Sequence, residues 1–192
     1  MITCILLSAG LSERFGSPKA LAQLYGTTVI EHLQKKILQT ACDEIIVVLG
    51  AHADQIQPFI FNHSRIRVVY NKDYNLGQTS SVKAGWREVN SSTGVMFFPV
   101  DCPLIQTSTI DKVIRHFKKH DPDILVPSYQ NKKGHPPIFH QRLRSKILDL
   151  PTGLGLNSLF ADHPPQTIEI DDPGIIESFN TPEEFETIIS KR

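Results

Sequence analysis

The sequence predicts an α/β fold, a three-layer sandwich in which helices cover both faces of a mostly parallel central sheet. Short apolar runs alternate with segments of helical period over the first two thirds of the chain. Such alternation is typical of strand–helix–strand units with parallel strands. The length of 192 residues suits one domain with a sizeable core. We therefore expect a single domain over residues 1–192.

The first half of the chain supplies three expected strands and two expected helices. Ile2–Leu7 is an apolar run that ends in small residues and glycine, as buried strands do when they lead into a loop. Val29–Gln39 places its isoleucines and leucines on one face of a helix. Glu44–Leu49 is a β-branched run that stops at a glycine and predicts a second strand. We expect a helix over Ala51–Ile60 and a strand over Ile66–Tyr70.

The second half continues the pattern less regularly. The expected helices are Ser80–Val89, Thr109–His120, Gln141–Leu150 and Pro182–Ser190. The expected strands are Gly94–Val100, Asp123–Pro127, Pro136–Phe139 and Thr167–Ile170. A cap residue, a proline and two acids mark the start of the last helix. Ligands of open parallel sheets bind beyond the carboxyl ends of the strands, so the loops after the first and fourth strands form the expected ligand edge.

Charge and cysteine usage point to a cytoplasmic protein with a small-molecule ligand. Twenty basic and twenty acidic residues give no net charge, so nucleic acid and membrane partners are not predicted, although a local basic patch could hold phosphates. Cys4, Cys42 and Cys102 lack the spacing of a zinc site and are odd in number, which favours a reducing cytosol. The apolar run at the N-terminus is too short for a signal peptide or a membrane span.

The segment Leu7–Lys19, L-S-A-G-L-S-E-R-F-G-S-P-K, is the first candidate binding motif. Small residues after a strand let backbone N–H groups approach an anion closely. Arg14 adds a planar fork for phosphate oxygens, and Lys19 adds a compact positive charge. The segment lacks the G-x-x-x-x-G-K-S/T pattern of a Walker A loop. The alternative is a polar surface loop between a strand and a helix.

The segment Phe97–Leu104 carries Asp101 at the end of an expected buried strand, followed by a cysteine and a proline. A carboxylate in that place suits Mg²⁺, which takes oxygen ligands and bridges substrate phosphates. The alternative is a helix cap or a turn aspartate. The thiol of Cys102 is a poor nucleophile candidate, because the neighbouring carboxylate raises its pKa.

Two further segments offer polar groups. Gly77–Ser81 carries an amide and hydroxyls that could contact a base edge and a ribose, while Thr79 or Ser80 could instead cap the following helix. Gly134–Phe139 places a histidine in a stiff turn before a strand. This histidine could take part in the chemistry, but a lone histidine is more often a structural group than a catalyst.

Together these motifs resemble the family of molybdenum cofactor nucleotidyltransferases, and most of all its cytidylyltransferase branch. The matching patterns are L-x-A-G-x-S-x-R-F-G-x-P-K, G-Q-x-x-S, P-V-D-C-P, G-H-P-x-x-F and N-T-P-E-E, in order over nearly the whole chain. The resemblance implies a Rossmann-like nucleotidyltransferase of the nucleotide-diphospho-sugar transferase type that uses Mg²⁺. It implies transfer of CMP from CTP to a molybdopterin-type cofactor with release of pyrophosphate, and later handover of the product to a molybdoenzyme.

The resemblance also implies site residues by motif position. The catalytic set is Lys19, Arg14 and Asp101, with Lys19 near the reacting phosphate and Asp101 on the metal. The nucleotide-binding set is Leu7, Ser8, Ala9, Gly10, Ser12, Gly16, Gln78 and Ser81. Gly134, His135 and Pro136 would line the acceptor side. Asn180 falls where related enzymes carry a second metal ligand, and its alternative role is to cap the last helix.

Three details bear on the substrate. Thr152–Asn157 lacks the acid and the arginine of the family's G-D-x-G-A-R-like stretch, which leaves the acceptor open. Asn180 replaces an acid of the family's D-I/V-D-T-P pattern and is a neutral ligand. Ala9 replaces a glycine of the guanylyltransferase branch, and its methyl group would take space that a purine needs, unless it only packs under the loop.

Two rival functions remain at this point. One is a related transferase that uses GTP or another NTP and a different phosphorylated acceptor. The other is a non-catalytic nucleotide- or cofactor-binding protein, whose sequence would be expected to lack Asp101 or Lys19, and both are present.

Overall fold

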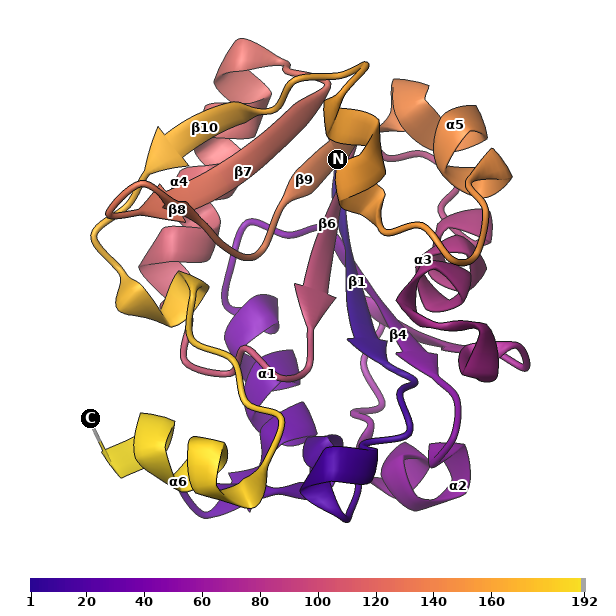
Figure 1. The fold of residues 1–192 in the computed structure, drawn as a ribbon, viewed down its shortest axis with the longest axis vertical. Helices are drawn as coiled ribbons and strands as arrows, with labels where there is room; N and C mark the ends of the chain where they lie inside the picture. The colour runs from indigo at the N-terminus through magenta and orange to yellow at the C-terminus, as the bar shows by residue number, and fades with distance from the viewer. Residues whose placement is uncertain (191–192) are drawn as a thin grey trace.

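The computed structural model describes residues 1–190, in which an eight-stranded sheet separates two layers of helices (Figure 1). The strands, in order across the sheet, are β10 (Gln166–Glu169), β7 (Ile124–Tyr129), β9 (Ile138–His140), β6 (Gly94–Pro99), β1 (Ile2–Ser8), β4 (Glu44–Leu49) and β5 (Ile66–Tyr70), with β8 (Lys132–Lys133) beside β7. Within this sheet, all strand pairs are parallel except those made by β8 and β9. The predicted α/β class with a mostly parallel sheet is confirmed.

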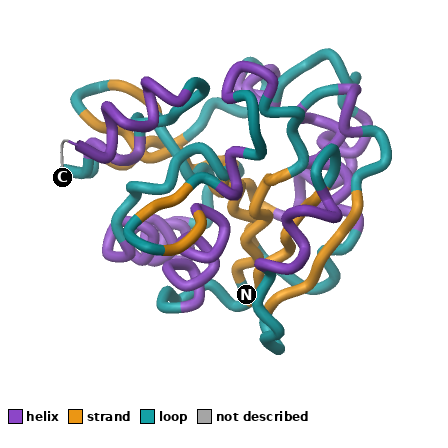
Figure 2. Tube along the Cα trace, turned by 90° about the horizontal axis from the view of Figure 1, so that it is seen from below, coloured by secondary structure: helices purple, strands orange, loops and turns teal. Residues whose placement is uncertain are grey.

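Strand β1 occupies the middle of the sheet, and all seven of its residues are buried. It pairs in parallel with β4 on one side and with β6 on the other. A strand covered on both faces has no solvent side, which explains why its sequence is an almost unbroken apolar run rather than an alternating one. The three strands end at the same edge of the sheet, and Figure 2 views the molecule from that edge.

Two layers of helices bury the two faces of the sheet. On one face pack α1 (Val29–Leu38) and α4 (Thr107–His120), and on the other α3 (Gln78–Arg87) and α5 (Arg144–Asp149). Helix α6 (Pro182–Ser190) lies beyond the edge of the sheet and joins the first of these cores through Phe185 and Ile188. The side chains of Thr28 and Glu31 form a reciprocal capping box at the start of α1, which explains the sharp boundary there. No helix within residues 1–190 is long and apolar enough to cross a membrane.

Most predicted elements are present with bounds that shift by at most two residues, and two predicted helices are shorter than expected. Ala51–Ile60 contains only α2 (Ala53–Ile56) and a 3₁₀ turn at Gln57–Phe59. Pro58 has no N–H group and its ring clashes with the preceding turn, so the α-helix cannot continue through it. Gln141–Leu150 begins as a 3₁₀ turn and becomes helical only in α5.

A small hairpin of β2 (Gln23–Leu24) and β3 (Thr27–Thr28) was not predicted. Its strands have two residues each, too few for an alternating pattern to register. Tyr25 and Gly26 both have positive φ angles, 51° and 80°, as the two-residue turns of tight hairpins require.

The close packing of α3 on the sheet can be tested at Gly85. A methyl group at this position would lie 2.7 Å from Ile5 Cγ2 and 2.9 Å from Val48 Cγ2. Replacing glycine by alanine normally stabilises a helix by about 1 kcal/mol, but overpacking costs roughly 1–3 kcal/mol. We therefore expect Gly85→Ala to lower the free energy of unfolding, measured by urea denaturation followed by circular dichroism. Gly153→Ala is the matched control, because nothing lies within 4 Å of its added methyl group. A Gly85→Ala protein more stable than wild type would contradict this packing.

Candidate active site

A cavity of about 490 Å³ opens at the edge of the sheet where β1 and β6 end. Parallel neighbours finish at the same edge, so the loops that follow them are brought together there. The loop after β1 and Asp101 after β6 both line this cavity. Of the eight predicted nucleotide-binding residues, seven line it: Leu7, Ser8, Ala9, Gly10, Ser12, Gln78 and Ser81.

Gly16, the eighth, does not line the cavity among its described walls and has a conformational role instead. Its φ angle of 76° places it in the left-handed region that glycine adopts most easily. It ends a 3₁₀ turn at Glu13–Phe15, and the chain then returns toward the cavity at Lys19. The backbone N–H group of Lys19 donates to Ser12 Oγ at 3.3 Å, which closes the loop on itself.

Aromatic packing fixes this loop to the C-terminal segment. The ring of Phe15 lies 5.3 Å from that of Phe179 and 6.0 Å from that of Phe185, measured between centroids. Phe179 is fully buried, and its ring is 4.6 Å from that of Phe185. The residue after Phe179 is Asn180, so the same packing brings the predicted second metal ligand to the cavity.

The predicted catalytic side chains and Asn180 meet in one cluster. Lys19 Nζ donates to Asn180 Oδ1 at 2.9 Å and lies 3.3 Å from Asp101 Oδ2. Arg14 Nη2 donates to the same Asn180 oxygen at 2.8 Å. The side chain of Lys19 is only 13% exposed, and its ammonium lies 5.5 Å above the centre of the Phe179 ring. Two cations, one carboxylate and one amide oxygen therefore face the cavity from three distant parts of the chain.

Asn180 does not cap α6, so the alternative prediction that it is the cap of the last helix is wrong. Its side-chain oxygen points to Arg14 and Lys19. The cap is Thr181, whose hydroxyl accepts from the backbone N–H of Glu184 at 3.2 Å. The carboxylate of Glu184 accepts in return from the backbone N–H of Asn180 at 2.6 Å. Since Thr181 supplies the cap, the amide of Asn180 is available to the cavity.

The residues of Gly77–Ser81 divide between the cavity and its supports. Gly77 is the N-cap of α3, so the interpretation of Thr79 or Ser80 as the cap is wrong. The hydroxyl of Thr79 donates to the carbonyl of Leu154, and that of Ser80 lies 2.7 Å from the carbonyl of Gly77. Gln78 is exposed at the cavity wall.

Ser81 is the more constrained of Gln78 and Ser81, the two residues predicted to lie near the nucleotide base or sugar. It is buried in the wall, and its hydroxyl oxygen accepts from Asn71 Nδ2 at 3.0 Å. Asn71 also donates to Ser80 at 2.8 Å. Nothing in the sequence marked Asn71, which follows a strand and has no motif around it.

Ala9 lines the cavity but is only 3% exposed, and its methyl group lies beside Gly50. A methyl group added at Gly50 would come within 2.8 Å of it. The methyl of Ala9 therefore packs under the loop, as the simpler of the two interpretations has it. This methyl group therefore gives no steric reason for the cavity to exclude a purine.

A second cavity of about 300 Å³ adjoins the first, and Leu7, Gln78 and Pro99 line both. Gly134 and His135 line the second cavity as predicted for the acceptor side, whereas Pro136 is buried and is not among its walls. The chain passes so close to Ile175 here that a methyl group on Gly134 would lie 2.4 Å from the Ile175 carbonyl oxygen.

The wall of the second cavity is mostly apolar, with few polar groups. Burial lowers the pKa of His135, partly opposed by the negative charge of Asp101, which favours a neutral imidazole there. Lys133 lies at the rim with its ammonium 5.0 Å from the centre of the Phe160 ring. Sequence reasoning missed both Lys133 and Phe160, because neither belongs to a recognisable motif. The remaining apolar walls are Val82, Phe97, Val126, Pro137, Phe139 and Leu156.

Cys102 sits beside the cluster but is not a nucleophile. It is 1% exposed, and burial raises the pKa of its thiol well above the ordinary value, with the neighbouring Asp101 carboxylate adding to the effect. From the sequence, only the effect of the Asp101 carboxylate was expected. All three cysteines are buried and unbridged.

The donor set fits a metal that arrives with phosphates. Within residues 1–190 no group of three or more histidine, cysteine or acidic side chains could hold a metal ion. Asp101 and Asn180 offer two hard oxygen atoms at the cavity. Mg²⁺ is often bound by one or two protein oxygens together with substrate phosphates and water, so these two residues suffice for it in that form.

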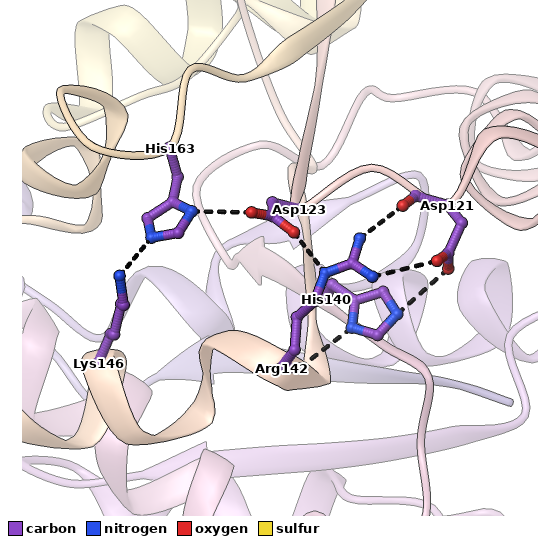
Figure 3. A network of polar contacts seen from close by, with 6 residues as sticks. All are labelled: Asp121, Asp123, His140, Arg142, Lys146 and His163. Atoms are coloured by element: carbon purple, nitrogen blue, oxygen red, sulfur yellow. Dashed lines mark hydrogen bonds and ion pairs between the residues drawn. The ribbon is translucent and has the colours of Figure 1, made fainter.

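A second polar network lies away from both cavities, around the start of β7 and the start of α5 (Figure 3). His163 Nδ1 is 2.8 Å from Asp123 Oδ2, and Lys146 Nζ is 2.7 Å from His163 Nε2. Arg142 donates to Asp123 and, at 3.1 Å, to Asp121. These bonds lower the pKa of Asp123 and tie together segments far apart in the sequence. None of the network's residues lines either of the two cavities described above, and its bonds connect β7 with the segments around α5.

The chain is similar to known nucleotidyltransferases over most of its length. The family model of the MobA-like NTP transferase domain matches residues 4–167. Molybdenum cofactor cytidylyltransferase of Escherichia coli (strain K12) is 29% identical over 188 residues, which cover 97% of this chain and 94% of the relative. Nicotine blue oxidoreductase of Paenarthrobacter nicotinovorans is 27% identical over 180 residues, covering 89% and 86%. A probable molybdenum cofactor guanylyltransferase of Bacillus cereus (strain ATCC 10987 / NRS 248) is 27% identical over 150 residues, covering 76% and 72%.

A solved structure shows the same fold. A nucleotidyl transferase from Methanothermobacter thermautotroptrophicus aligns with a TM-score of 0.83 and 22% sequence identity, covering 100% of this chain and 97% of the other.

Two single substitutions can test whether Thr181, and not Asn180, caps α6. Thr181→Ala removes the cap of α6 and should lower the free energy of unfolding by about 1 kcal/mol. Asn180→Ala removes no cap and should lower it by less, on the order of 0.5 kcal/mol at most. Urea denaturation of both variants measures this. If Asn180→Ala were the more destabilising, its amide would have the structural role that we assign to Thr181.

Proposed function

The chain belongs to the family of MobA-like NTP transferase domains, and from this premise we propose that it transfers CMP from CTP to a molybdopterin-type cofactor and releases pyrophosphate. The observation that carries the proposal is the cluster of four side chains in the first cavity, beside the loop after β1: Arg14, Lys19, Asp101 and Asn180. It combines cations for a triphosphate with two oxygen atoms for Mg²⁺ in a cavity of nucleotide size.

The reaction is an in-line displacement at the α-phosphorus. An oxygen of the acceptor phosphate forms the new P–O bond, the bond to the bridging oxygen of the β-phosphate breaks, and pyrophosphate leaves with that electron pair. No covalent bond to the protein is required, which agrees with the buried, weakly acidic thiol of Cys102. Catalysis of this kind consists of positioning and of neutralising negative charge.

The residues of the cluster have distinct tasks in this scheme. Lys19 and Arg14 neutralise the triphosphate, and backbone N–H groups of the loop from Ala9 to Gly16 hold its oxygens. Asp101 and Asn180 would hold Mg²⁺, which supplies Lewis-acid neutralisation of the phosphate oxygens when bound. The first cavity takes the nucleotide and the second takes the acceptor. Their shared wall at Leu7, Gln78 and Pro99 supports a transfer between them.

The acceptor is assigned to the second cavity because of its walls. They are mostly apolar and aromatic, and Lys133 is a cation placed at the rim. Such a lining suits a flat heterocycle that carries a phosphate group. Leu156 and Asn157 belong to the stretch that departs from the family pattern. They line the second cavity and not the first, so we assign the altered residues to the acceptor side.

Use of CTP rests on the cytidylyltransferase relative and on Gln78, which can pair with a base edge from the shared wall. The guanylyltransferase relative favours GTP as the second candidate. The oxidoreductase relative shows that similarity over most of the chain accompanies more than one named activity. The proposal therefore depends on the phosphate-binding cluster rather than on similarity alone.

The direct test is a pyrophosphate-release screen of the four NTPs with molybdopterin cofactor and with a panel of phosphorylated sugars and alcohols. We expect CTP with molybdopterin cofactor to give the highest kcat/KM, at least about tenfold above GTP, because hydrogen-bonding sites reject bases that leave their groups unpaired. A preference for GTP would move the chain to the guanylyl branch. Absence of pyrophosphate release with every pair would refute the transferase assignment.

The role of Asp101 can be tested with Asp101→Asn, which keeps the shape of the side chain and removes its charge. We expect kcat to fall on the order of a hundredfold or more, since Lewis-acid stabilisation of a phosphoryl oxygen is worth several kcal/mol. Steady-state kinetics at several Mg²⁺ concentrations measure the loss, and circular dichroism checks that the fold is intact. Asp43→Asn serves as a control for removing an aspartate elsewhere, because Asp43 lines neither cavity. Wild-type turnover by folded Asp101→Asn would exclude the metal-holding role.

A further inference from the structure

The two oxygen atoms that the proposed function gives to a metal ion are already in contact with an ammonium group. Lys19 Nζ lies 2.9 Å from Asn180 Oδ1 and 3.3 Å from Asp101 Oδ2. A divalent cation in contact with both oxygens would need the space between them that the ammonium fills. The lysine and the metal therefore compete for one position.

The ammonium is seated in this position by several independent contacts. The side chain of Lys19 is 13% exposed, its charge lies over the Phe179 ring, and its backbone N–H group bonds to Ser12 Oγ. Phe179 is itself fully buried and precedes Asn180 directly, so the ring and the amide oxygen approach the lysine together. A cation between a carboxylate, an amide oxygen and an aromatic face is well satisfied without any metal.

The charge of the cluster also opposes a bare metal ion. Arg14 donates to Asn180 Oδ1 at 2.8 Å, so a second cation touches the same oxygen. Lys19 and Arg14 carry two positive charges and Asp101 one negative charge, while Asn180 is neutral, which leaves a formal charge of plus one. Glu13 also lines the cavity and brings the formal charge of its wall to zero, so it is the four contacting groups, rather than the cavity as a whole, that attract a polyphosphate anion and repel a free divalent cation.

We propose that the Lys19 ammonium occupies the position of the divalent cation. It thereby blocks the metal site until a triphosphate binds. The anion draws the ammonium and the guanidinium onto its oxygens, and the Asp101 and Asn180 oxygens become available to the metal that accompanies it. Metal and nucleotide therefore bind together, and each raises the affinity of the other by the same factor. This inference rests on the proposed function of the cavity, and it adds an order of binding to it.

The test measures metal binding without any reaction. Mn²⁺ is titrated into the full chain, and the free ion is followed by its electron paramagnetic resonance signal. Without nucleotide we expect weak binding by the wild type and binding at least about tenfold tighter by Lys19→Met, a coupling of ordinary size. Lys19→Gln serves as a second neutral variant in case the first does not fold, as judged by circular dichroism. Lys118→Met, which removes an exposed lysine of α4, is the control and should match the wild type.

The titration is repeated with a CTP analogue that has a methylene group between its α- and β-phosphorus atoms. We expect the analogue to tighten Mn²⁺ binding to the wild type by a larger factor than to Lys19→Met, because only the wild type must first release its ammonium. If folded Lys19→Met and Lys19→Gln both bind Mn²⁺ without nucleotide no more tightly than the wild type does, the proposal is wrong. Failure of the pyrophosphate-release screen would refute the reaction but leave this Mn²⁺ pattern unchanged, so the two failures are distinguishable.

Discussion

The hydrogen bond between Lys19 and Asn180 joins residues 161 positions apart and connects the two ends of the chain at the candidate site. It forms because two features of the fold converge. The central, fully buried β1 delivers the loop that carries Lys19 to the same edge of the sheet as Asp101 at the end of β6. The aromatic packing of Phe15 against Phe179 then brings the C-terminal segment across that edge. The cluster is thus a product of the sheet's topology and of one apolar contact.

Much of the fold could be predicted from the sequence because buried parallel strands leave a strong compositional trace. Glu44–Leu49 and Ile66–Tyr70 have the predicted bounds, since both are rich in β-branched residues. All of β4 except its first residue is buried, whereas β5 is an edge strand that is only half-buried and ends in the exposed Tyr70. The hairpin at Gln23–Thr28 could not be predicted, because its two-residue strands carry no period. The helix expected over Ala51–Ile60 failed at Pro58, where an interior proline outweighs the surrounding pattern.

The candidate site was predictable to the extent that its residues lie in short motifs. Lys19, Arg14 and Asp101 do so, and they meet in space. Asn71 and Lys133 were missed because each contributes through tertiary position alone, one by orienting Ser81 and the other by approaching the acceptor cavity. No local pattern encodes such placements. The roles of all these residues in catalysis stay predictions. That their charges meet in one cluster follows from the fold rather than from any one motif.

The measurement that tests this account most directly is a crystal structure of the chain with Mn²⁺ and a non-hydrolysable CTP analogue. The account predicts anomalous density for the metal against Asp101 and Asn180, the triphosphate along the loop from Ala9 to Gly16, and the Lys19 ammonium on a phosphate oxygen instead of on Asn180. A triphosphate bound in the 300 Å³ cavity, or a metal held elsewhere with the contact between Lys19 and Asn180 intact, would contradict it.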